Sequence, residues 1–318
     1  MIIHDYHNAA AILNQGQLVA IPTETVYGLA ANGFDGNAIA QIYEVKNRPQ
    51  FNPLILHSNS LERFKSWGIH LPDEALKLAQ AFSPGPITFV VPKSDTIPDI
   101  VTAGHSSVAI RIPNHPTTLK LLAMLNFPLA APSANLSGTV SPTTAQHVNN
   151  QLGELIGAVL EGGECEIGLE STIISFVNEQ PQLLRLGGLS IEAIEEVLGM
   201  ALDKSKLINN DNPEAPGMLS KHYAPNTPLR IGKPEDFIEF CDYTQMAYIG
   251  FNNLNPNLKE EHQLILSEQG NLEEAAQKLF AAIRQADALN LKLIVADYFP
   301  DEHLGRAIND RLARAAKN

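Results

Sequence analysis

Short apolar runs alternate along most of the chain with segments whose apolar residues recur at helical spacing. Residues 18–21 are apolar throughout, which is typical of a buried strand, and residues 36–45 place Ile39, Ile42 and Tyr43 on one helical face. The same criteria predict further strands at residues 54–57, 87–91, 107–112, 129–131, 158–160, 171–176 and 183–186. They predict helices at residues 7–15, 73–82, 116–125, 141–152 and 191–198. Strands outnumber the helices that could connect parallel neighbours, so we expect a large, twisted, mixed α/β sheet.

The pattern changes after residue 200. Residues 201–228 are rich in Asn and Pro and lack a core-facing period, which predicts a linker. The centre of this linker carries Lys221, His222 and Tyr223, a cluster that favours a lid or a binding loop over a passive connection.

Residues 229–318 return to alternating strands and helices. The predicted strands are 229–231, 246–249, 264–266 and 291–296, and the predicted helices are 234–241, 272–289 and 303–316. This alternation predicts a small, Rossmann-like α/β domain. We therefore divide the chain into a large domain at residues 1–200, a linker at 201–228 and a small domain at 229–318.

Composition narrows the classes of function. The chain has 318 residues, of which 44% are hydrophobic, and its net charge is −13, so we expect no tight, non-specific binding of nucleic acid. Cys165 and Cys241 provide neither a disulfide framework nor a metal cluster. The first residues lack the basic start and apolar core of a signal peptide, and no apolar run approaches the ~20 residues that span a bilayer. We expect a cytoplasmic protein without a membrane segment.

Basic residues are scarce, so their positions are informative. Lys46 and Arg48 are the first Lys and Arg in the chain, and they directly follow the predicted helix at 36–45. They could form a solvated helix terminus, or a Lys charge and an Arg fork that bind phosphate oxygens. Arg111 lies inside an apolar strand, where a cation is costly unless it pairs with an acid or binds an anion. The spacing leaves both alternatives open at each place.

Polar groups after strands provide further candidates. Ser133 follows the strand at 129–131 and could face a ligand or bond its own turn. Ser141 precedes a proline and is predicted to cap the helix at 141–152, where the helix terminus would also favour phosphate. The last helix carries four basic residues, which we interpret as a solvated face, with RNA contact as the alternative. They are Arg306, Arg311, Arg314 and Lys317.

Several segments together identify a family. They are PTETVYG (22–28), KNRP (46–49), NPLILH (52–57), PSANLSG (132–138), SPTTAQHV (141–148), GLESTIISF (168–176) and LLRLGG (183–188). They resemble the YrdC-domain family of threonylcarbamoyl-AMP synthases over roughly residues 8–200. APGMLSKHYAP (215–225) resembles the linker of the long, two-domain members. Asn47 stands where this family most often has Gly. The chain lacks the G-x-x-x-x-G-K-[ST] phosphate loop and the H-E-x-x-H motif, so a nucleotide would bind without them.

The resemblance implies a YrdC-like domain, a linker and a small α/β domain. It implies an L-threonylcarbamoyladenylate synthase, a nucleotidyltransferase that makes L-threonylcarbamoyl-AMP and pyrophosphate from ATP, L-threonine and bicarbonate or CO2. The product would serve the threonylcarbamoyladenosine modification of tRNA through a downstream tRNA-modifying transferase complex. Mg2+ would enter with ATP, without a metal ligand from the protein.

The family's functional positions map onto this sequence. The catalytic pair would be Lys46 and Arg48. The ATP-binding positions would be Arg48, Asn52, Ser107, Ser133, Ser141, Arg185 and Tyr223. The threonine-binding positions would be Thr25, His57, Arg111, Ala131 and Ser171. Because Tyr223 lies in the linker, the resemblance implies that the linker folds over the site as a lid.

Two other functions are compatible with the core motifs. One is a carbamoyl-transfer domain of hydrogenase-maturation proteins, but those carry zinc-finger segments and this chain has two cysteines. The other is a non-catalytic RNA-binding module, which the net charge of −13 disfavours. Binding of tRNA at low salt discriminates the RNA-binding alternative from the enzyme.

Overall fold

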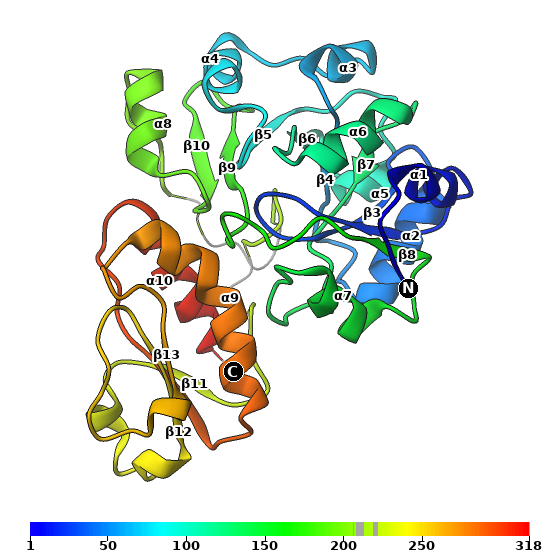
Figure 1. Cartoon of the computed structure of the whole chain (residues 1–318). Helices are drawn as coiled ribbons and strands as arrows, with labels where there is room; N and C mark the ends of the chain where they lie inside the picture. Colours follow the sequence, from blue (N-terminus) through cyan, green and yellow to red (C-terminus); the bar gives the residue numbers. More distant parts are fainter. Residues whose placement is uncertain (206, 208–212, 219–221, 318) are drawn as a thin grey trace.

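The fold has a large and a small part, each built on its own sheet (Figure 1). The computed structural model describes residues 1–205, 207, 213–218 and 222–317. Part of the predicted linker, including Lys221, lies outside the described residues. None of the helices in these ranges is long and apolar enough to cross a membrane. Cys165 and Cys241 are both free thiols, as the sequence predicts.

The large part contains a ten-stranded mixed sheet, which confirms the predicted fold class. Its strands are β1 (Ile2–Ile3), β2 (Val19–Ile21), β3 (Gly28–Asn32), β4 (Ile55–His57), β5 (Ile87–Pro92), β6 (Ser107–Arg111), β7 (Leu129–Ala130), β8 (Ala158–Leu160), β9 (Thr172–Ser175) and β10 (Gln182–Arg185). Their order is β1-β8-β2-β3-β7-β4-β6-β5-β9-β10. The helices around it are α1 (Tyr6–Asn14), α2 (Gly36–Lys46), α3 (Leu61–Ser66), α4 (Asp73–Phe82), α5 (Asp99–Thr102), α6 (Pro116–Met124), α7 (Ala145–Leu152) and α8 (Ile191–Leu198).

Helix α2 illustrates how local chemistry sets the bounds of an element. The Asp35 side chain accepts from the backbone N–H of Asn37, at 2.9 Å, and of Ala38, and so caps the N-terminus. The helix ends at Asn47, whose φ of 50° lies in the left-handed region. Asn adopts this conformation more readily than other non-glycine residues, which explains how it replaces Gly here.

Strand pairing brings the ends of several strands to one edge of the large sheet. β4 and β6 are parallel, and their last residues, His57 and Arg111, are register partners. β10 runs antiparallel to β9, so that Arg185 at its end lies opposite Ile173 near the start of β9. Polar side chains from distant parts of the sequence are thereby gathered at this edge.

The small part contains four parallel strands in the order β11-β14-β12-β13. Its elements are β11 (Leu229–Ile231), η1 (Pro234–Phe237), η2 (Tyr243–Gln245), β12 (Met246–Gly250), η3 (Glu260–His262), β13 (Gln263–Ile265), α9 (Leu272–Ala288), β14 (Leu293–Ala296) and α10 (His303–Ala315). Helices α9 and α10 lie on the side of this sheet that faces the large part (Figure 1). Leu279, Phe280 and Ile283 of α9 are fully buried and anchor this second core.

Two predicted helices differ from the structure, and one central strand was not predicted. The segment that forms β3 was not predicted as a strand, because GLAAN has small residues where strands usually have β-branched ones. The helix predicted at 141–152 begins at Ala145, and Thr144, not Ser141, is its cap. The helix predicted at 234–241 is only a four-residue 3₁₀ turn, η1.

The predicted solvated face of the last helix is wrong for two of its cations. Arg311 is fully buried and Arg314 is 3% exposed, because α10 packs toward the large part. Buried cations are tolerated when acids and carbonyls surround them. Asp310 accepts from both, at 2.7 Å from Arg311 Nη1 and 3.0 Å from Arg314 Nε.

Candidate active site

A cavity opens at the edge of the large sheet where the strand ends gather. Its lining comes from the segments after β2, α2 and β7, the start of β3, strand β4, the ends of β6 and β10, the residues before β9, and the linker. The lining residues are Thr23, Val26, Gly28, Arg48, Ile55, His57, Arg111, Ala131, Pro132, Ser133, Glu170, Ser171, Arg185, Pro216, Gly217, His222 and Tyr223. Most positions predicted to bind ATP or threonine are therefore brought together in one place.

Two guanidinium groups are fixed by backbone carbonyls at the cavity wall. Arg48 donates from Nε to Asn52 O at 3.1 Å and from Nη2 to Pro53 O at 2.8 Å. Arg185 donates from Nη2 to Ser171 O at 2.8 Å and from Nη1 to Pro216 O at 3.2 Å. Burial lowers the pKa of both groups to about 10, so both are cationic at neutral pH. Fixed, partly desolvated cations of this kind attract phosphate and carboxylate groups strongly.

Arg111 is paired with an acid that the sequence analysis did not select. Its Nη2 lies 2.7 Å from Glu24 Oε1, and the two side chains are 5% and 3% exposed. Arg111 Nε also donates to Gly85 O at 3.2 Å. The ion-pair alternative is thus realised, while Arg111 still lines the cavity. The signal for Glu24 was its position inside PTETVYG, next to the selected Thr25.

His57 is neutral at physiological pH. Burial, and then the charge of Arg111, lower the pKa of His57 to about 3. Its Nδ1 lies 3.1 Å from Ile55 O. In the tautomer that donates this hydrogen bond, Nε2 is an acceptor. The imidazole can therefore accept a hydrogen bond without adding charge to the cavity.

Lys46 contacts the loop that carries Ser133 and does not line the cavity. Its Nζ donates to Ser133 O at 2.6 Å and to Asn135 O. Burial and the nearby Arg48 hold the pKa of Lys46 well below its usual range. Lys46 is thus placed to fix the backbone of this loop, and Asn52 likewise offers its carbonyl to Arg48.

Three other predicted residues also lie outside the lining. Thr25 bonds through its hydroxyl to Thr23, at 2.8 Å, and Thr23 is in the lining. The Ser141 hydroxyl donates to Glu170 at 2.7 Å. Ser107 begins β6, four residues before Arg111 on the same strand. Their substrate contacts remain predictions.

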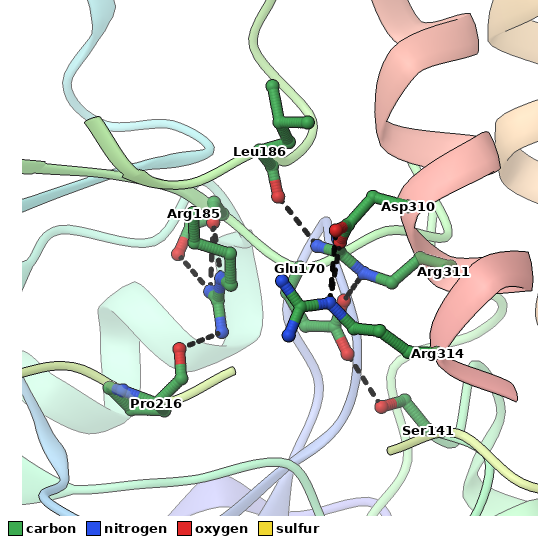
Figure 2. A network of polar contacts seen from close by, with 9 residues as sticks. Ser141, Glu170, Arg185, Leu186, Pro216, Asp310, Arg311 and Arg314 are labelled. Carbon is green, nitrogen blue, oxygen red and sulfur yellow. Dashed lines mark hydrogen bonds and ion pairs between the residues drawn. The ribbon is translucent and has the colours of Figure 1, made fainter. Parts of the chain in front are cut away.

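Glu170 is the second functional candidate that the sequence analysis missed. It lines the cavity, is 6% exposed, and lies between Ser141 of the large part and Arg311 of the small part (Figure 2). Burial alone would raise the pKa of this carboxyl. The charges of Arg311 and Arg185 and the Ser141 hydroxyl more than compensate, and lower the pKa of Glu170 to about 2. Its position in GLESTIISF, beside the selected Ser171, was the available signal.

The described linker residues complete the wall. Gly217 has φ +86°, and a Cβ there would lie 2.6 Å from Arg185 Cδ, so glycine is required for this close approach. Tyr223 is 1% exposed and stacks on Phe280 of α9, with ring centroids 5.4 Å apart. The linker thus touches both the cavity and the small part.

The donor set suits anions better than a resident metal. Within the described residues, no three His, Cys, Asp or Glu side chains are grouped to hold a metal ion. The cavity offers guanidinium, hydroxyl and backbone groups, which are the usual partners of phosphate and carboxylate.

Known proteins resemble this chain over nearly its whole length. The family described as "Telomere recombination" matches residues 11–187, and "Threonylcarbamoyl-AMP synthase, C-terminal domain" matches residues 189–317. The threonylcarbamoyl-AMP synthase of Pyrococcus abyssi is 39% identical over 97% of this chain and 93% of its own length. That of Bacillus subtilis is 40% identical over 97% of this chain and 92% of its own.

A solved structure is similarly close. The crystal structure of P. abyssi Sua5 complexed with L-threonine has a TM-score of 0.90 and 37% identity, covering 99% of this chain and 97% of that one. The match at residues 189–317 disfavours the hydrogenase-maturation alternative, because it is specific to the C-terminal domain of the synthases. Since the resemblance extends through both sheets and the linker between them, this chain belongs to the threonylcarbamoyl-AMP synthase family in its long, two-domain form.

Proposed function

We propose that this protein makes L-threonylcarbamoyl-AMP and pyrophosphate from ATP, L-threonine and bicarbonate or CO2. The observation that carries the proposal is the set of three buried guanidinium groups, Arg48, Arg111 and Arg185, around one cavity. The chain as a whole has a net charge of −13, so this concentration of cations is local. It fits a reaction whose substrates are a triphosphate and an amino-acid carboxylate.

Threonine would occupy the side of the cavity near β4 and β6. Arg111 would pair with the threonine carboxylate, and His57 would accept a hydrogen bond from the amine. Ala131, Ser171 and Thr25 would shape the remainder of this pocket. A relative of known structure, P. abyssi Sua5, is described as complexed with L-threonine, which supports this substrate.

ATP would occupy the side near β10 and the linker. Arg48 and Arg185 would contact the phosphates, together with Ser133 and Tyr223. Lys46 would act by holding the loop that presents Ser133. Mg2+ would enter as MgATP and be held by the phosphate oxygens. Glu170 would not serve as a metal ligand, because both of its oxygens already accept hydrogen bonds from protein groups.

The chemistry needs positioning more than a protein nucleophile. The threonine amine would attack the carbon of CO2 and release a proton to solvent, or attack bicarbonate and release water, and either route gives an N-carboxylate. An oxygen of that carboxylate then attacks the α-phosphorus of ATP, and pyrophosphate leaves. Guanidinium groups held by fixed carbonyls can stabilise the charge on the phosphates without reorganising.

The linker would act as a lid. A carbamoyl adenylate reacts with water, so the site must exclude solvent. Pro216, Gly217 and Tyr223 line the cavity, which supports this role for the described part of the linker. Replacing Tyr223 with Ala should raise the ratio of ATP consumed to product formed, as measured by paired assays of pyrophosphate and the adenylate. An unchanged ratio would argue against the lid.

The product would pass to a downstream tRNA-modifying transferase complex. With a net charge of −13, the protein itself would bind tRNA weakly. Micromolar binding of tRNA with a steep salt dependence would instead favour the RNA-binding alternative.

The test is an assay of pyrophosphate release from MgATP and bicarbonate, with and without L-threonine. We expect release to depend on threonine and to be lost in Arg48→Ala. The matched control is Arg230→Ala, which removes an exposed guanidinium from the small part and should leave the rate unchanged. Pyrophosphate release that does not depend on threonine, or an Arg48→Ala variant as active as the control, would contradict the proposal.

A further inference from the structure

The Glu170 carboxylate joins the small part of the molecule to the wall of the cavity. Arg311 Nε, from α10, donates to Glu170 Oε2 at 2.9 Å, and the Ser141 hydroxyl donates to Oε1 at 2.7 Å (Figure 2). Both oxygens of the carboxylate are therefore engaged, one by each part of the molecule. The orientation of Ser141 depends on a carboxylate that Arg311 holds.

Arg311 itself is held from several directions. It is fully buried, and its Nη2 donates to Leu186 O at 2.7 Å. Its guanidinium lies over the ring of Tyr223, 5.2 Å from the centroid. The same side chain thus contacts Tyr223 of the linker and the residue after β10, which ends at Arg185. These positions surround the part of the cavity where we place the triphosphate.

The charges there must be balanced for an anion to bind. Glu170 lines the cavity and is ionised at neutral pH. Arg311 neutralises the Glu170 carboxylate and does not itself line the cavity. Without Arg311, a buried carboxylate would face the bound phosphates with less compensation, and like charges at this burial repel strongly.

We propose that Arg311 of the small part is a positioning residue for ATP, acting through Glu170, Ser141 and Tyr223. This inference rests on the proposed function, and it assigns the small part a role in binding ATP. The small part supplies the counter-charge that allows Glu170 to face a triphosphate, so the catalytic cavity is incomplete without it.

The first test replaces Arg311 with Met, which keeps the apolar stem and removes the charge. We expect the KM for ATP to rise about tenfold or more, since one partner of a buried pair is removed, while the KM for threonine changes little. A general loss of folding would reduce the amount of active enzyme and leave both KM values unchanged.

The second readout is the pH profile. Arg311 is the largest of the influences that lower the pKa of Glu170, so that pKa should rise in Arg311→Met. Lowering the pH from 8 to 6 should then protonate Glu170 in the variant. The ratio of the variant's KM for ATP to the wild-type KM, both measured at the same pH, should therefore fall. The double variant Glu170→Gln with Arg311→Met removes both charges. It should recover much of the affinity for ATP and lose the extra pH dependence.

The matched control is Arg306→Met on the same helix. Arg306 also bridges the two parts, through Glu192 of α8, but the two side chains are 31% and 39% exposed and neither lines the cavity. It should leave both KM values unchanged. A rise in the KM for ATP equal to that in Arg311→Met would mean that only docking matters and would overturn the inference. An unchanged KM for ATP in Arg311→Met would also overturn it, whereas wild-type protein without threonine-dependent pyrophosphate release would overturn the proposed function instead.

Discussion

Arg111 provides the sharpest test of the threonine site. The proposed Arg111→Met variant keeps the apolar stem of the side chain and removes the guanidinium that would pair with the substrate carboxylate. Because Arg111 ends β6, on the side of the cavity where we place threonine, the change should affect threonine more than ATP.

The structure sets the expected magnitude. A hydrogen bond to a charged group contributes about 1.5–3 kcal/mol, and each 1.4 kcal/mol corresponds to about tenfold in affinity. The KM for threonine should therefore rise about 10- to 140-fold, and the KM for ATP less than about threefold. The same change leaves Glu24 buried without its cation, which can cost about 3–5 kcal/mol of folding free energy.

The assay is the initial rate of pyrophosphate release, with each substrate varied in turn. Thermal unfolding of the same samples separates the folding cost from the binding effect. The double variant Glu24→Gln with Arg111→Met removes both buried charges and should restore stability but not the affinity for threonine. Equal increases in the two KM values, or a double variant that regains normal use of threonine, would refute the carboxylate assignment.

Three further predictions follow from local geometry. Thr144→Ala removes the side chain that accepts from His147 N–H and should lower the free energy of unfolding by about 1 kcal/mol in urea titrations; no change would mean that the cap is replaced. Gly217→Ala places a methyl group against Arg185 at a positive φ, so the KM for ATP should rise; an unchanged value would show that the linker yields easily. His57 has a folded pKa of about 3 against 6.5 when unfolded, so unfolding takes up a proton between these values and stability falls as the pH drops through this window, by up to about 1.4 kcal/mol per unit. His57→Gln should make the measured slope of unfolding free energy against pH shallower, and an unaltered slope would contradict the burial of a neutral imidazole.

Sequence reasoning located elements best where one signal dominated. The predicted bounds of α4 and α8 match the structure, because each has a strong apolar face and clear terminating residues. It missed β3 because this strand depends on pairing with β2 and β7, and its small residues give no local signal for a strand. It also predicted Ser141 as the N-cap of this helix, whereas Thr144, which has the same kind of hydroxyl group, is the cap in the structure.

Sequence reasoning predicted which cations line the candidate site better than it predicted the ion pairs around the site. Arg48, Arg111 and Arg185 were selected and all line the cavity. The partner of Arg111, Glu24, was not selected, and neither was Glu170, which pairs with Arg311. Members of each pair are distant in sequence, so local patterns do not reveal the pairing. Arg311 in particular looked like one of four surface cations, and only the packing of α10 against the large part explains its burial.

Because the chain is synthesised from its N-terminus, Glu170 is made well before Arg311, its partner in the buried pair. Arg185 ends the large sheet, whereas Arg311 follows only after the whole of the small sheet has been made. At about 5–20 residues per second, the interval between them is roughly 6–25 s of translation. During that interval the emerging large part can fold with Glu170 lacking its cation, so it should bind ATP poorly. On the proposed role of Arg311, translation would therefore impose a delay on activity: a nascent chain would begin to consume ATP only after its last helix has docked.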